Sequence, residues 1–243
     1  MGQLYFMSGA NAGLSKRIDE IKESSRPPEL QLVKIVDSSC TECFDINQIS
    51  SAVQSLNVKI TKTDAVEYSS DMAKQLISQL GIKKIPALVF SGETNKPEIA
   101  SLMSQIGAGV KDGTYYIESI PPYRNLESGS VEGVVTKVTI TDASCQTCYD
   151  PSLHDQILPG FGISPTNEYT YDRVSAEGKQ LIEKYNITKV PTILLSPESR
   201  LYPRIVQVWN SVGTIEADGW YVFRDTGQMG NYTDLTTGTV VSE

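Results

Sequence analysis

The chain repeats itself at an interval of 105 residues, and this repeat constrains its fold more than any other feature. The four cysteines form two Cys-x-x-Cys motifs at 40–43 and 145–148, and 145 − 40 = 105. Residues around the motifs match at the same interval, as do the segments 81–86 and 186–191, which both end in proline. An internal repeat of this length indicates a duplicated domain, so we expect two domains of about a hundred residues each.

Each copy alternates strands and helices in the same order. Apolar, β-branched runs at 32–36 and 134–140 predict strands that end just before the cysteine motifs. Apolar residues at helical spacing follow the first motif, which predicts that Cys40 lies at the start of a helix. The later elements are predicted as strands near 58–60, 87–90, 114–117, 168–171, 192–195 and 220–223, and as helices at 70–80, 97–106, 175–185 and 202–212. This order predicts an α/β fold with a mixed sheet flanked by helices in each copy.

Turn-forming residues mark the limits of the predicted domains. A short amphipathic helix at 14–24 ends before two prolines, and the amino-terminal extension is placed at 1–28. Two prolines and a glycine between 121 and 129 mark a linker, which places the domains at 29–130 and 131–243. The Thr- and Gly-rich tail of the second domain is expected to lie extended over the surface.

The composition describes a folded globular chain with an acidic balance. Lys plus Arg total 21 and Asp plus Glu total 29, a formal charge of −8 that argues against nucleic acid or an anionic membrane surface as partner. No apolar run approaches the ~18 residues that span a bilayer. Residues 1–13 lack the pattern of an intact secretion signal, although a membrane anchor outside the given chain is compatible with this start. All cysteines occur in pairs, which favours an extracytoplasmic location in the cell envelope over the alternative, the cytoplasm.

A Cys-x-x-Cys motif at the start of a helix is suited to thiol–disulfide exchange. The positive end of the helix favours the thiolate over the thiol form of the first cysteine. The second cysteine lies one turn further on, within reach to close a disulfide or to resolve a mixed one. Pro86 and Pro191 precede strands, where a cis X-Pro bond would present backbone edges to a bound substrate.

The strand, the cysteine motif and the later proline together resemble the thioredoxin-like superfamily, over residues 29–118 and 131–224. As a tandem arrangement the chain is similar to the two-domain protein disulfide oxidoreductases. The resemblance implies two tandem thioredoxin-like domains and an enzyme that needs no organic cofactor, with protein thiols or disulfides and an unidentified redox partner as its partners. It further implies attacking Cys40 and Cys145, resolving Cys43 and Cys148, and substrate-binding segments with cis proline at Ile85, Pro86, Val190 and Pro191.

The sequence also departs from thioredoxin itself. Serines, Ser39 and Ser144, precede the motifs where a typical thioredoxin has Trp, and no Gly-Pro lies between the cysteines. The strand before each motif lacks the buried carboxylate of the family. The end of each copy is predicted as helix then strand, whereas a thioredoxin has strand then helix. Identity with thioredoxin is therefore not expected.

Two other function classes use the same cysteines. A metal-binding protein would hold an ion with these thiolates, with Asp37 or Asp142 as further ligands. The separation of 102 positions from Cys43 to Cys145 is too long for a zinc ribbon, and no metal site is predicted. A redox-inactive binding module would keep the fold and carry structural disulfides.

Residues near the motifs predict a difference between the copies. Glu42 opposes thiolate formation inside the first motif, whereas Gln146 is neutral, so Cys145 is expected to be the more acidic nucleophile. Asp142, like its match in the first copy, is expected to end or cap a strand. His154 is the single histidine and is expected to be a solvated or capping residue.

Overall fold

The computed structural model describes residues 16–18, 21–23 and 25–242. These residues group into two compact units, and we describe each by itself. The first unit contains the chain up to Ser38 and residues 45–119, and the second contains residues 39–44 and the chain from Ile120 onward. The domain limits predicted from the sequence, 29–130 and 131–243, remain a prediction.

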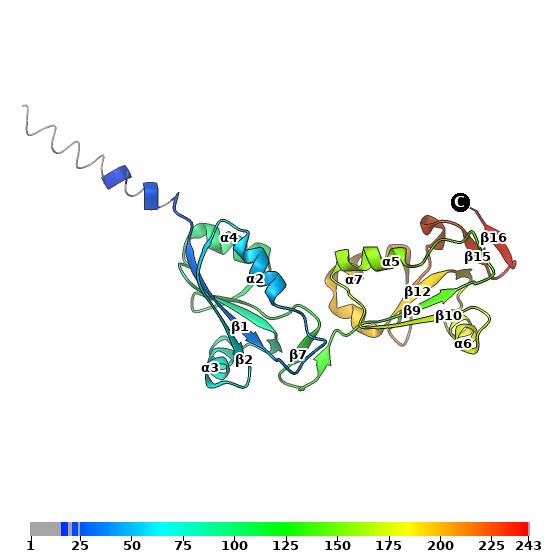
Figure 1. Ribbon diagram of the computed structural model, residues 1–243, viewed down its shortest axis with the longest axis horizontal. Helices are drawn as coiled ribbons and strands as arrows, with labels where there is room; N and C mark the ends of the chain where they lie inside the picture. Colours follow the sequence, from blue (N-terminus) through cyan, green and yellow to red (C-terminus); the bar gives the residue numbers. More distant parts are fainter. Residues whose placement is uncertain (1–15, 19–20, 24, 243) are drawn as a thin grey trace, which may run out of the picture. The chain divides into compact units, whose positions relative to one another are not determined.

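The first unit has a mixed sheet of strand order β2-β1-β4-β6-β5, in which β1 and β2 are parallel and the other neighbours antiparallel. Helices α2 and α4 lie on one side of the sheet and α3 on the other (Figure 1). The elements are, in chain order, β1 Glu29–Val36, α2 Asn47–Gln54, β2 Lys59–Glu67, α3 Asp71–Leu80, β3 Lys84–Ile85, β4 Ala87–Gly92, α4 Pro97–Gln105, β5 Gly109–Lys111 and β6 Thr114–Ile117.

The second unit has a sheet of the same design, with the strand order β10-β9-β12-β14-β13. A second small sheet has the order β11-β15-β16, and β7 pairs with β8 in a hairpin. The elements are, in chain order, β7 Tyr123–Asn125, β8 Val131–Glu132, β9 Thr136–Thr141, α5 Leu153–Ile157, η1 Leu158–Phe161, β10 Asn167–Asp172, α6 Ala176–Lys184, β11 Lys189–Val190, β12 Thr192–Leu195, η2 Pro197–Leu201, α7 Pro203–Val212, β13 Gly213–Ile215, β14 Tyr221–Phe223, η3 Thr226–Met229, β15 Tyr232–Asp234 and β16 Thr239–Val241.

The central strands bury side chains on both faces, as expected for a sheet that is covered by helices on both sides. Ile193 and Leu195 of β12 belong to the apolar core that includes Ile205 and Trp209 of α7. Leu194, between them, belongs to the core on the opposite face, against Leu181 of α6. The predicted α/β fold with a mixed sheet flanked by helices is therefore confirmed in both copies.

Serine side chains cap the starts of helices α3 and α6. The side chains of Ser70 and Ser175 accept hydrogen bonds from the backbone N–H groups of Ala73 and Gly178 at the starts of α3 and α6. Gly81 ends α3 in the left-handed conformation, with φ of 74°. In both copies a helix, α4 or α7, precedes the closing hairpin, which confirms the predicted departure from the order of elements in thioredoxin.

Two segments differ from the predictions. The expected linker forms the β7–β8 hairpin, and its turn closes with a hydrogen bond from Gly129 N–H to Asn125 C=O at 2.8 Å. The carboxyl-terminal tail does not lie extended over the surface. Instead, β15 pairs with both β11 and β16, and Tyr232 and Thr233 are buried. Apolar periodicity could not predict these hairpins, because their strands are only two or three residues long.

The predicted helix at 14–24 falls only partly within the described residues, and those at 16–18 and 21–23 are helical. No helix in the described ranges has the length and apolar character that crossing a membrane requires.

Candidate active site

Both Cys-x-x-Cys motifs form a disulfide within the motif. Cys40 is bonded to Cys43 with 5.4 Å between their Cα atoms, and Cys145 is bonded to Cys148 with 5.6 Å. All four cysteines are partly exposed, and the two residues between each pair are exposed. Both disulfides therefore lie near the protein surface, unlike the inert disulfides of a buried core.

The prolines that follow each motif are both preceded by a cis peptide bond, as predicted. The bonds are Ile85-Pro86 and Val190-Pro191. Thr192, directly after Pro191, pairs with Ile140 near the end of β9. The proline therefore lies at the end of the sheet where the chain leaves β9 for the second cysteine motif. In the first copy Ala87 pairs with Ile35 in the same way.

Tyr149 connects the second cysteine motif to the cis proline. Its hydroxyl donates a hydrogen bond to the backbone C=O of Pro191 at 3.0 Å, and its backbone N–H donates to the C=O of Asn231 at 2.8 Å. Phe44 occupies the matching position of the first copy, where its N–H donates to Pro122 C=O at 2.7 Å. Because Phe44 has no hydroxyl, the side-chain bond exists only in the second copy.

Thr233 of the carboxyl-terminal hairpin lies behind the second disulfide. Its Oγ1 is 3.5 Å from Cys148 Sγ and donates a hydrogen bond to Asp142 Oδ2 at 2.8 Å. Its backbone pairs with Val190, directly before the cis proline. The single hydroxyl proton is used toward Asp142, so in the reduced protein Oγ1 can accept a hydrogen bond from the Cys148 thiol. The predicted substrate-binding edge at Val190 is thus adjacent to β15.

Both copies have a mixed sheet in which one pair of strands is parallel. In both, a Cys-x-x-Cys disulfide follows the strand β1 or β9, and a cis proline precedes the antiparallel strand β4 or β12. Both copies have a thioredoxin-like fold. No protein-family profile matches the chain, and no curated protein matches it.

Among the solved structures similar to this chain are three at low identity. A mutant of the alkylhydroperoxide reductase AhpF from Enterococcus faecalis is 13% identical, with 76% of this chain and 89% of that chain covered and a TM-score of 0.24. The NTD_N/C domain of the same reductase is 14% identical, with the same coverage of 76% and 89% and a TM-score of 0.21. A protein disulfide oxidoreductase from Aeropyrum pernix K1 is 17% identical, with 73% and 82% covered and a TM-score of 0.19.

The prediction that the cysteines lie at helix starts is wrong. Helix α2 begins at Asn47 and α5 at Leu153, several residues after the motifs. An aspartate lies just before each helix. Asp45 Oδ1 accepts a hydrogen bond from Asn47 N–H, and Asp150 Oδ1 accepts one from Ser152 N–H, each at 2.9 Å. These carboxylates bond the first free amide groups, so the positive end of each helix faces an aspartate instead of a sulfur atom.

The carboxylate of Asp142 caps the turn that leads into the second motif, as the sequence predicts. It is only 7% exposed. Ser144 donates to its Oδ1 from the backbone at 3.0 Å and from the hydroxyl at 2.5 Å, and Arg173 Nε lies 2.8 Å from Oδ2. Burial alone would raise the pKa of Asp142, but the hydrogen bonds from Ser144, Arg173 and Thr233 outweigh it and lower the pKa to about 2. A permanent negative charge therefore lies close to Cys148.

The expectation of a solvated or capping His154 is wrong. The side chain is 4% exposed, and its Nε2 lies 3.2 Å from the hydroxyl of Tyr149. Burial lowers the pKa of His154 to about 4, so the imidazole is neutral at pH 7. Burial also raises the pKa of Tyr149, which keeps its proton.

In each copy, a carboxylate at the end of the neighbouring strand, β2 or β10, accepts a hydrogen bond from the backbone just before the cysteine motif. Glu67 Oε2 accepts from Ser38 N–H at 3.2 Å, and Asp172 Oδ2 accepts from Ala143 N–H at 2.6 Å. Both pairs match at the 105-residue interval of the repeat. This shared contact fixes the backbone just before the first cysteine in both copies.

Within the described ranges, no three His, Cys, Asp or Glu side chains lie together where they could hold an ion. Asp142, the candidate further ligand in the second copy, has its carboxylate bonded to Ser144, Arg173 and Thr233 instead.

Sequence reasoning missed Thr233, Tyr149 and the role of Arg173. A comparison of the two copies could have singled out Tyr149, because a hydroxyl is added where the first copy has Phe44. No signal in the sequence points to Thr233, which lies 85 residues from Cys148 in the chain.

Proposed function

We propose that this protein is a thiol–disulfide oxidoreductase that exchanges dithiols and disulfides with protein substrates. The observation that supports this most directly is the second site, where the accessible Cys145–Cys148 disulfide is linked through Tyr149 to the carbonyl group of cis Pro191. The first copy also has a disulfide within its motif, Cys40–Cys43, and a cis bond before Pro86.

In the reducing direction, the Cys145 thiolate attacks one sulfur of a substrate disulfide. The substrate S–S bond breaks, and its other sulfur leaves as a thiolate that takes a proton from water. Cys148 then loses its thiol proton and attacks Cys145, which releases the second substrate thiolate and forms the Cys145–Cys148 disulfide. Two electrons pass from the protein dithiol to the substrate, and the same steps in reverse oxidise a substrate dithiol.

The surroundings of the two cysteines support these proposed roles. Cys148 has Thr233 Oγ1 as an acceptor for its thiol proton and the negative charge of Asp142 behind it, and both favour its protonated form. Thr233 makes no such contact with Cys145, so we assign the attack to Cys145. Ile85, Pro86, Val190 and Pro191 are proposed to contact substrate. Because β15 pairs with Val190, a substrate would reach this segment beside the hairpin or after displacing it.

Variants of the resolving cysteines test this function. Cys148→Ser and Cys43→Ser should each trap a mixed disulfide between the remaining attacking cysteine and a peptide that contains a disulfide, seen as an adduct by mass spectrometry. The native protein should accelerate insulin reduction by dithiothreitol, and the variant with all four cysteines replaced by serine should not.

Two results would contradict the proposal. One is the absence of adducts with both variants together with insulin reduction no faster than with dithiothreitol alone, as expected for a redox-inactive binding module. The other is a reduced protein that binds stoichiometric zinc and shows no exchange, as expected for a metal-binding protein.

A further inference from the structure

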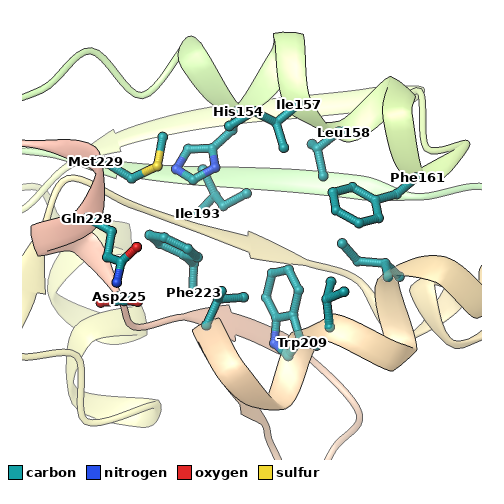
Figure 2. Close-up of a pocket in the computed structure, with 13 residues that line it drawn as sticks. His154, Ile157, Leu158, Phe161, Ile193, Trp209, Phe223, Asp225, Gln228 and Met229 are labelled. Carbon is teal, nitrogen blue, oxygen red and sulfur yellow. The ribbon is translucent and has the colours of Figure 1, made fainter.

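A cavity of about 290 Å³ lies in the second domain between α5 with η1 on one side and α7 on the other. Its apolar wall includes Leu158, Phe161 and Trp209, and its polar lining is His154, Asp225 and Gln228. In Figure 2 the polar side chains lie toward one end, while Leu158 and Phe161 lie toward the other. None of the cysteines or cis prolines lines this cavity, so it is separate from the proposed exchange site.

The hydrogen bonds of Tyr149 determine which nitrogen of His154 carries the proton. Tyr149 has one hydroxyl proton, and it is donated to Pro191 C=O at 3.0 Å. His154 Nε2, 3.2 Å from the same hydroxyl, must therefore donate its own proton to the Tyr149 oxygen. In the neutral ring this leaves Nδ1 as an acceptor, and no described residue makes a hydrogen bond to it. His154, which is only 4% exposed and lines the cavity, thus has an acceptor nitrogen, Nδ1, that is free to bond to a ligand.

The remaining polar residues limit the charge of a ligand. Asp225 is the charged side chain of the lining, and no Lys or Arg accompanies it there. A carboxylate or phosphate would meet this negative charge without a compensating cation. The cavity therefore favours a neutral molecule over a fatty acid or another anion.

Its size fits a small ring system. A dry, apolar cavity of about 150 Å³ suffices to bind benzene, and ordinary ligand pockets begin at roughly 300 Å³. We propose that this cavity is a binding site for a neutral one- or two-ring aromatic molecule that carries a single O–H or N–H donor, which bonds to His154 Nδ1 while the rings pack against Leu158, Phe161 and Trp209.

The first copy supplies a matched substitution. Ile49 stands 105 residues before His154 and offers no acceptor, so His154→Ile removes the hydrogen bond and keeps an apolar wall. Val208→Trp, on the lining part of α7, would fill the cavity. Val206→Trp, exposed on the same helix, adds the same ring outside it and serves as the control.

Calorimetric titration with three related probes tests the site. The oxidised protein should bind 2-naphthol about tenfold more tightly than naphthalene, because one buried hydrogen bond is worth roughly that factor. It should not bind 2-naphthoate. The preference for 2-naphthol should disappear in His154→Ile, and binding of both neutral probes should be lost in Val208→Trp but kept in Val206→Trp.

A readout on the native protein removes any dependence on the folding of the variants. Because the chain has one histidine, its ring ¹⁵N signals are unambiguous, and 2-naphthol should shift the Nδ1 signal more than naphthalene does. The proposal is overturned if neither neutral probe binds, if naphthalene or 2-naphthoate binds as tightly as 2-naphthol, or if Nδ1 does not respond. The cysteines take no part in this test, so its failure would leave the proposed exchange function untouched.

Discussion

At the scale of single residues, the second site depends on hydroxyl groups that each have one proton to donate. Thr233 donates to Asp142, and Tyr149 donates to Pro191. Each hydroxyl oxygen can then accept from a second group, the Cys148 thiol of the reduced protein in one case and His154 Nε2–H in the other. These two side chains connect the cysteine motif to the hairpin, the cis proline and the helix α5.

The buried histidine makes stability dependent on pH in a window where few other groups titrate. His154 has a pKa of about 4 in the folded protein, while an unfolded histidine has about 6.5. Below pH 6.5 the unfolded chain therefore binds a proton that the folded protein does not, and this contribution to stability is present above pH 6.5 and lost as the pH falls toward 4. Between pH 7 and pH 5 the free energy of unfolding should fall by about 2 kcal/mol from this residue alone.

Urea unfolding of native protein and of His154→Gln at pH 7 and pH 5 measures this loss. Gln keeps an N–H donor for Tyr149 but does not titrate. The variant should lack the ~2 kcal/mol decrease. Equal decreases in both proteins would show that His154 is already protonated in the fold at pH 5.

At the scale of elements, the carboxyl-terminal hairpin is part of the site. Strand β15 pairs with β11 and places Thr233, which is 2% exposed, between Asp142 and Cys148. In the same way, Asp45 and Asp150 move the starts of α2 and α5 away from the sulfur atoms. The site is therefore built by loops and a short hairpin at the end of a regular sheet.

The Thr233 hydroxyl can be tested apart from the shape of its side chain. Thr233→Val should lower the free energy of unfolding of the oxidised protein by about 1–3 kcal/mol, because the buried carboxylate of Asp142 loses a donor. Thr233→Ser keeps the hydroxyl and should lose less. The measurement is urea unfolding at pH 7. A loss in Thr233→Ser as large as that in Thr233→Val would mean that methyl packing, not the hydrogen bond, gives Thr233 its effect.

At the scale of the whole molecule, the two copies share a framework and differ in the chemistry around the disulfide. Both have the cis proline, the carboxylate that holds the motif entry and the aspartate that opens the following helix. Only the second copy has a tyrosine hydroxyl and a histidine in the matching positions, where the first has Phe44 and Ile49. The duplication thus provides two similar sites whose cysteines need not react alike.

The charge inside each motif should separate the two attacking cysteines. Glu42 is exposed next to Cys40 and Cys43, with its Oε2 3.1 Å from Thr41 Oγ1, whereas Gln146 is neutral. Since a negative charge disfavours a thiolate, the pKa of Cys40 should exceed that of Cys145. In a variant that keeps only the first pair, Glu42→Gln should raise the alkylation rate of Cys40 at pH 7 about twofold, a modest factor because solvent screens an exposed charge.

The reciprocal change, Gln146→Glu in a variant that keeps only the second pair, should slow alkylation of Cys145. Iodoacetamide kinetics from pH 5 to pH 9 measure both effects. If Cys40 reacts at lower pH than Cys145 in otherwise native motifs, the predicted order is wrong.

The duplication, the order of strands and helices and the disulfide motifs with their prolines were all predictable from the sequence. Each of these depends on residues that are close in the chain or on a pattern that occurs twice, and such information is local. Only the folded protein shows that His154 is buried, that the helices begin after the cysteines and that Thr233 contacts both Asp142 and Cys148. These contacts join residues up to 91 positions apart. They depend on the pairing of strands only two or three residues long and on the packing of helices against the sheet. Local sequence patterns do not encode either of these.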